Sequence, residues 1–207
     1  MYLWHEPVLR LITIAVFVFV LGMGMGMVAD AALAEGFAAG SLGFGLLIAC
    51  WGTGSVLGTG VGRWMTARTE PVWVFTGSVG VMVAAFAVGF APVFPLVLIA
   101  LLFMGICDGL TIVAENGIMQ RRTPDAVRSR VMAAFEAVLS LGLVVSYLMA
   151  SRVLNALHYH AQPVYRIAGV FALVSSLILL PLLGLRRGSS EVEPFELTDG
   201  SVDVEAP

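Results

Sequence analysis

The stretch Leu11–Ala29, which reads LITIAVFVFVLGMGMGMVA, decides the fold because it carries no charged residue over the length of a membrane crossing. An α-helix needs about 20 consecutive apolar residues to span the hydrocarbon core of a bilayer. Similar stretches recur along the chain, namely Ser41–Gly62, Val72–Cys107, Ile167–Leu185, and Val131–Ser151 with Glu136 as its one charge. The sequence therefore predicts an all-α, polytopic membrane protein.

Composition supports the same conclusion. The 207 residues are 59% hydrophobic and 12% charged, and the mean hydropathy is +0.95. A soluble domain has roughly 45–50% apolar and about 25% charged residues. A water-soluble core has no use for this much apolar surface, so we expect a lipid bilayer as the solvent.

The longest stretch, Val72–Cys107, exceeds one crossing, and Pro92 with Pro95 divides it because proline disfavours helix at the residue before it. Six transmembrane helices result, at about 9–32, 41–65, 72–90, 94–119, 129–152 and 165–185, within a domain of residues 1–187. The first could instead be a secretory signal. Its apolar run is longer than the 7–15 residues of a signal core, so we favour a retained helix.

Arginines indicate the orientation. Nine of the eleven fall on one side of a six-helix zigzag, and two, Arg152 and Arg166, fall on the other. Cytoplasmic loops carry an excess of basic residues. We therefore expect a multi-pass protein of the cell membrane with both termini cytoplasmic, and outer connections near 30–40, 91–95 and 152–163.

The last segment, residues 188–207, changes character, because six of the fourteen acidic residues lie after residue 190. It has too few large apolar residues to bury a core, so we expect a disordered cytoplasmic tail, either merely solvated or a binding segment. Cys50 and Cys107 lie in apolar runs and are expected to be small packing residues.

Glycines point to helix packing. Gly54, Gly58 and Gly62 form a double GxxxG ridge, which lets another helix approach closely in lipid. In the first helix, glycines alternate with methionines over 22–27. That alternation fits either core packing or a flexible, polarisable wall facing a substrate.

Polar residues at membrane depth are the candidates for function, since a charge at the bilayer centre costs about 2.5–3.5 kcal/mol on insertion scales. The fourth helix carries Asp108, Thr111, Glu115 and Asn116, and the fifth carries Glu136, Ser140 and Tyr147. Their spacing of three, four and seven residues predicts one polar stripe on each helix. Such stripes are expected to line an aqueous pathway, with Thr111, Asn116, Ser140 and Tyr147 as lining residues.

Depth suggests different roles for the acids. Glu115 and Glu136 lie close to a basic loop, so they are candidates either for structural ion pairs or for gating and proton binding. Asp108 lies nearer mid-membrane with no basic neighbour in sequence. It is the first candidate for proton coupling or cation recognition, with a protonated, hydrogen-bonded core residue as the alternative.

The basic loop itself, Gln120–Val131, is expected to hold the cytoplasmic ends of neighbouring helices. Thr123 or Asp125 can cap the helix that follows, and Pro124 suits its first turn. The loop and gate candidates are Arg63, Arg68, Arg121, Arg122, Asp125, Arg128 and Arg130.

An enzyme is not expected, because the sequence has no nucleophile–base pattern and no phosphate-binding loop. His158 and His160 alone are a weak metal signal, and neither a metal, a cofactor nor a nucleic-acid partner is expected.

Together, the six helices, the glycine-rich second helix ending in Gly58–Trp64 with Arg68 beyond, and the loop Thr123–Val131 resemble the carboxy-terminal half of a major facilitator superfamily transporter, in particular of drug and siderophore exporters. The resemblance covers about Pro7–Arg187. The family's loop after the second helix is similar to Gly-x-x-x-Asp-Arg-x-Gly-Arg, matched here by Gly58, Arg63 and approximately Arg68. Gly62 replaces the acid and Met65 the later glycine, and such decay is typical of the second half.

The resemblance implies alternating access, in which two six-helix halves rock around a site near the midplane. It implies a proton-coupled exporter of hydrophobic or amphipathic small molecules. The other half would come from a second polypeptide or a second copy of this chain. The alternative is a truncated, non-transporting membrane protein, an orphan half or an assembly subunit.

Overall fold

The computed structural model describes residues 5–62 and 64–184, and within them it is entirely helical. The elements are α2 (Pro7–Gly36), α3 (Gly40–Gly62), α4 (Glu70–Gly89), α5 (Phe94–Arg122), η1 (Asp125–Val127), α6 (Arg128–Ala156) and α7 (Ala161–Gly184). Six of these helices are long and apolar enough to cross a membrane. The prediction of an all-α, six-span protein is confirmed. Arg63, Arg186, Arg187 and the acidic tail lie outside the described residues.

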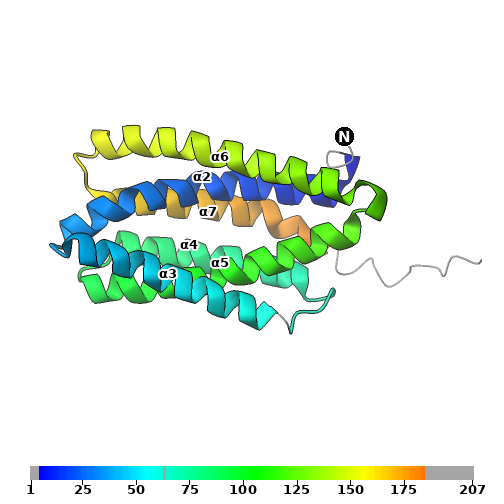
Figure 1. Cartoon of the computed structure of the whole chain (residues 1–207), viewed down its shortest axis with the longest axis horizontal. Coiled ribbons are helices and arrows are strands. Elements are labelled where there is room, and N and C mark those ends of the chain that lie inside the picture. The colour runs from blue at the N-terminus through cyan, green and yellow to red at the C-terminus, as the bar shows by residue number, and fades with distance from the viewer. Residues whose placement is uncertain (1–4, 63, 185–207) are drawn as a thin grey trace, which may run out of the picture.

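The helices run up and down as a bundle (Figure 1). The first turn of α2 and the α3–α4 and α5–α6 connections meet at one end, called here the arginine-rich end because it carries Arg10, Arg68, Arg121, Arg122, Arg128 and Arg130. The other three connections meet at the opposite end. Proline begins three of the helices within the first two positions, where its missing N–H has no intrahelical partner to lose.

The first helix is longer than the sequence suggested. We expected the first helix to end at about residue 32 and an outer connection near 30–40, which put Asp30 at their boundary, but α2 continues to Gly36 and Asp30 lies inside it. The alanines between Ala29 and Ala34 explain the difference, because alanine is the strongest helix former. The chain turns only after Phe37, with positive φ angles of 55° at Ala38 and 59° at Gly40.

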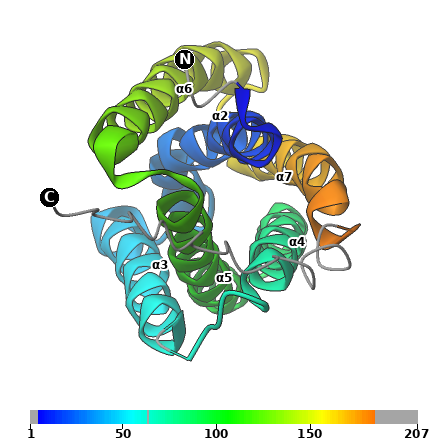
Figure 2. The same ribbon diagram turned by 90° about the vertical axis from the view of Figure 1, so that its right-hand side faces the viewer.

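Seen along its length, the bundle has α3 and α6 at its outside, flanking the other long helices (Figure 2). Helices α2, α4, α5 and α7 pack around the centre, whereas α6 packs mainly on α2 and α3 mainly on α5. The flanking helices are the least buried of the six. In an 18-residue apolar segment of each helix, 17% of α3 and 22% of α6 is buried, against 50% of α2. Their outer surfaces therefore expose large side chains such as Leu42, Val56, Leu141 and Leu148.

Glycines bring the backbones of α3 and α5 together. A Cβ atom on Gly54 or Gly58 would collide with the carbonyl oxygens of Leu102 and Ile106, and one on Gly62 would meet the side chain of Val113. Gly105 of α5 makes a matching close contact, because a Cβ there would collide with the carbonyl of Trp51 in α3. Dense backbone contact of this kind is what holds helices together in lipid, where apolar burial gives no net gain between helices.

Hydroxyl groups connect the central helices to one another and to the flanking helix α6. Ser175 of α7 donates to the carbonyl oxygen of Ala15 in α2 at 2.8 Å, and Ser146 of α6 donates to that of Leu21. The hydroxyls of Ser78 and Ser176 bond each other between α4 and α7 at 2.9 Å. Each such bond contributes about 0.6–2 kcal/mol within a membrane.

The α3–α5 contact leads to a test with two matched glycines. Gly58→Ala places a Cβ against the α5 backbone and should lower stability by about 1–3 kcal/mol. Gly60→Ala should not lower it, because a Cβ there has no atom within 4 Å and alanine favours helix. Melting temperatures of the two purified variants in detergent would measure the difference, and equal values would contradict the packing.

Candidate functional site

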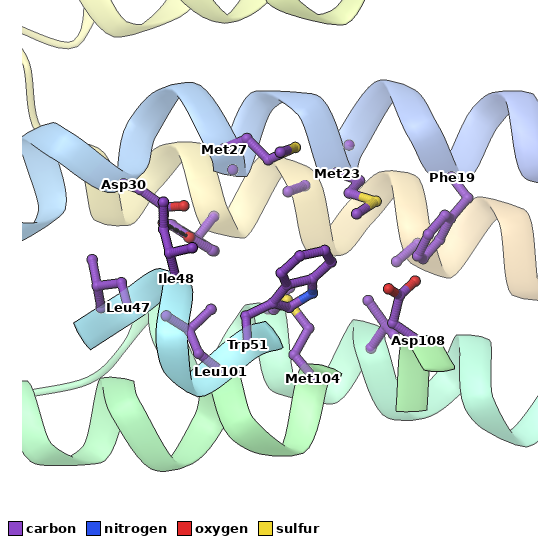
Figure 3. Close-up of a pocket in the computed structure, with 17 residues that line it drawn as sticks. Phe19, Met23, Met27, Asp30, Leu47, Ile48, Trp51, Leu101, Met104 and Asp108 are labelled. Carbon is purple, nitrogen blue, oxygen red and sulfur yellow. Dashed lines mark hydrogen bonds between the residues drawn. The ribbon is translucent and has the colours of Figure 1, made fainter. Parts of the chain in front are cut away.

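A partly open cavity of about 130 Å³ lies among five of the six long helices (Figure 3). Helix α2 supplies six of the 17 lining residues, more than any other helix, and α3, α4, α5 and α7 supply the rest. The lining residues are Phe19, Gly22, Met23, Gly26, Met27, Asp30, Leu47, Ile48, Trp51, Val81, Ala85, Leu101, Met104, Asp108, Tyr165, Ala168 and Ala172. Most of the lining side chains are apolar, and two of them, Asp30 and Asp108, carry carboxylates.

The glycine–methionine run of α2 serves two surfaces. Met23 and Met27 line the cavity, together with Gly22 and Gly26. Met25, on another side of the helix, is fully buried in the core. Core packing therefore describes Met25, while Met23 and Met27 contribute flexible thioethers to the cavity wall, and a substrate-facing role for them stays a prediction.

Asp108 lies halfway along α5, in the cavity wall, and is 3% exposed. Its Oδ2 atom is buried and has no hydrogen-bond partner within the described structure. Burying an ionised carboxylate without a partner costs free energy, and a bound proton or cation would remove that cost. Phe19 and Met23 of α2 lie across the cavity from it in Figure 3.

A second carboxylate, Asp30, enters the same cavity from α2. It accepts a hydrogen bond from the hydroxyl of Tyr165 in α7, whose side chain is buried. The sequence did not single out Asp30 because the residue stood at the predicted boundary between the first helix and a connection. Its four-residue spacing from Gly22 and Gly26, continued into the alanine-rich segment, is the signal that could have found it.

The other polar residues of α5 do not line the cavity. The hydroxyl of Thr111 donates to the carbonyl of Cys107 at 2.9 Å and lies against Gly77 of α4. The amide of Asn116 donates to the carbonyl of Ile112 at 2.9 Å. Glu115 is buried on α5, two helical turns beyond Asp108 towards the arginine-rich end.

The polar residues of α6 lie away from the cavity. Glu136, Ser140 and Tyr147 are exposed on this flanking helix. Tyr147 approaches the cavity most closely, because its hydroxyl lies 3.8 Å from the sulfur of Met27. The stripe is therefore open to a neighbouring molecule.

Two arginines of the basic loop pair with acids on other segments. Arg121 pairs with the buried Glu70 at the start of α4, and Arg122 bonds Glu6, the N-cap of α2, at 3.0 Å. Arg128 pairs within the loop with Asp125 at 2.5 Å. The end of α5 is thus bound to the starts of α2 and α4, and neither Glu115 nor Glu136 takes part in these pairs. Arg68 and Arg130 are exposed.

Within residues 5–62 and 64–184, no cluster of three or more His, Cys, Asp and Glu side chains is arranged to hold a metal ion. The chemical features of the cavity are its two carboxylates and its apolar wall.

A family model described as Major Facilitator Superfamily matches residues 12–200. The chain belongs to the major facilitator superfamily. Members of this superfamily are transporters, which agrees with a multi-pass helical protein whose cavity lies between its helices. No curated protein sequence matches the chain.

The ion pair between Arg121 and Glu70 predicts an asymmetric response to mutation. Arg121→Ala should destabilise the chain by about 3–5 kcal/mol, because it leaves the Glu70 carboxylate, 7% exposed, without its cation. Glu70→Gln should cost less, about 1–3 kcal/mol, because the Arg121 side chain is 49% exposed and can be hydrated. Denaturation of both variants in detergent would compare them.

Asp125→Asn is the control for that comparison. Its carboxylate is 87% exposed, so losing the pair with Arg128 should change stability by less than about 1 kcal/mol. Equal losses for Arg121→Ala and Glu70→Gln would show that the burial of Glu70 does not govern the pair.

Proposed function

We propose that this chain is a secondary active transporter, or one half of one, that exports hydrophobic or amphipathic small molecules in exchange for protons by alternating access. The observation that supports this proposal most strongly is Asp108, a carboxylate with an unpaired buried oxygen in the wall of an apolar cavity. The wall suits an apolar cargo, and the carboxylate suits the coupling ion.

Coupling would follow from the electrostatics of that carboxylate. A charged Asp108 is costly in a low-dielectric cavity, and binding either a proton or a cationic group removes the cost. The two occupants would therefore exclude each other, which is the requirement for exchange. Glu115, on the same side of α5 two turns nearer the arginine-rich end, is the candidate next step of a proton path, and Glu136 is a candidate gating acid.

The arginine-rich end is the proposed gate. The pairs of Arg121 with Glu70 and Arg122 with Glu6 join the ends of three helices, so breaking them would release the end of α5 from the starts of α2 and α4. Arg63, Arg68, Arg128, Arg130 and Asp125 are the further loop and gate candidates. We place this end on the cytoplasmic side of a cell membrane, because cytoplasmic loops carry the excess of arginine.

A second six-helix half would cover the flanking helices. The outer side of α3 carries Gly45, Gly52 and Gly60, and an added Cβ on any of them would meet nothing within 4 Å. That surface suits close helix approach. The exposed Glu136, Ser140 and Tyr147 of α6 would then face the same partner, which is either a separate chain or a second copy.

Transport by reconstituted vesicles tests the coupling residue. Vesicles containing the full chain and its partner half, with a pH indicator inside, should show proton movement when the amphipathic dye ethidium is added. Asp108→Asn should abolish this movement, because an amide keeps the shape of the carboxylate but does not titrate. Unchanged coupling would remove Asp108 from the role.

Glu35→Gln is the matched control, since Glu35 is an exposed acid of α2 that does not line the cavity. It should transport as the wild type does. Glu136→Gln separates a gating acid from a structural one, because loss of expression without a specific transport defect would indicate a structural role.

The assembly state tests the need for a second half. Differently tagged copies of the chain, or the chain and a co-expressed six-helix partner, should co-purify in mild detergent. Gly45→Leu should weaken this association while leaving the melting temperature of the single chain unchanged, because its Cβ has nothing within 4 Å. A stable monomer under every condition would instead support the alternative of an orphan half that moves no substrate.

A further inference from the structure

We propose that the cavity binds an elongated organic dication, a molecule with an apolar middle and a cationic nitrogen at each end. One nitrogen pairs with Asp108 and the other with Asp30. This inference rests on the proposed transport function, because it names the class of molecule that the same cavity would carry.

The charge of the cavity selects cations. Among the described residues that line it, two are acidic and none is basic. An anion would therefore face two carboxylates without a compensating group, and a neutral molecule would leave both without a charged partner. Buried charges are tolerated in proteins when they are paired and hydrogen-bonded. A dication satisfies both acids at once.

Each carboxylate is available to a ligand. Asp108 presents a buried Oδ2 atom that has no partner in the described structure. Asp30 uses Oδ1 to accept the hydroxyl of Tyr165, and an ionised carboxylate has further lone pairs for an ammonium group. The Tyr165 bond also holds the Asp30 side chain in the cavity wall, so Tyr165 acts as a positioning residue for the second nitrogen.

The two acids lie at different ends of the cavity. In Figure 3, Asp108 is drawn with Phe19 towards one end, and Asp30 with Ile48 towards the other. Phe19 precedes Asp30 by 11 residues (30 − 19) on α2, a rise of about 16 Å at 1.5 Å per residue. A ligand that reaches both carboxylates must therefore be long.

Apolar side chains fill the space between the acids. Met23 of α2, Trp51 of α3 and Met104 of α5 lie between Asp30 and Asp108 in Figure 3. They offer an alkyl or aromatic chain apolar contact, and methionine adapts to its shape. A polar linker would lose its hydrogen bonds to water there, which excludes hydrophilic polyamines with nitrogens in the middle.

Equilibrium dialysis tests the proposal without transport. The probe is a radiolabelled ten-carbon α,ω-diamine, and the sample is the full chain in lipid nanodiscs, with empty nanodiscs subtracted. The wild type should bind this diamine at least about tenfold more tightly than the ten-carbon monoamine or the four-carbon diamine, and should not bind the ten-carbon diol. This comparison needs no variant, so it stands even if a mutant fails to fold.

Variants test whether each of the two acids binds one nitrogen of the diamine. Asp108→Asn and Asp30→Asn should each weaken diamine binding by about tenfold and abolish the preference for diamine over monoamine. Tyr165→Phe should weaken the diamine more than the monoamine, because it releases only the second acid. Glu35→Gln, an exposed acid on the same helix as Asp30, should bind as the wild type does.

The outcomes separate this inference from the transport function. Equal binding of monoamine and diamine, or an unchanged preference in Asp30→Asn, overturns the dication site. Vesicles that transport ethidium while the diamine does not bind also overturn it, and they leave the transporter intact. Diamine binding that depends on both acids supports the site even where vesicles show no transport.

Discussion

The absence of water in the hydrocarbon core is the constraint on which this structure depends. Every backbone N–H and C=O at membrane depth must find its partner within the protein, so the chain crosses as continuous helices and turns only at the ends. The same medium removes the hydrophobic gain from helix association, and packing and hydrogen bonds must supply it. The Gly54–Gly58 ridge against α5 and the hydroxyls of Ser146 and Ser175 are the contacts that result.

The fold could be read from the sequence because its determinants are local. Apolar run length and the proline pair at 92 and 95 each act within a few residues of their position. Asp30 shows where this reasoning ends. A charged residue after an apolar run suggests the membrane surface, yet alanine propensity extends α2 past it, and a tyrosine 135 residues further along supplies the partner.

The site was predicted less completely than the fold, since helical spacing gives the side of a helix but not its neighbour. Asp108, Thr111 and Glu115 share one side of α5, and only Asp108 lines the cavity. Thr111 instead lies against Gly77 of α4, a contact that depends on how α4 and α5 are rotated. Such rotations follow from the packing of the whole bundle, which no short pattern contains.

The backbone contact between α3 and α5 has a mechanical consequence. No side chain separates the two helices where the carbonyl of Trp51 meets Gly105, so their backbones lie in direct contact. Trp51 and Asp108 therefore lie on two closely packed helices, while Met23, Met27 and Asp30 lie on α2. A change in the spacing between α2 and the α3–α5 pair would therefore move the indole of Trp51 and the carboxylate of Asp108 together, relative to Asp30.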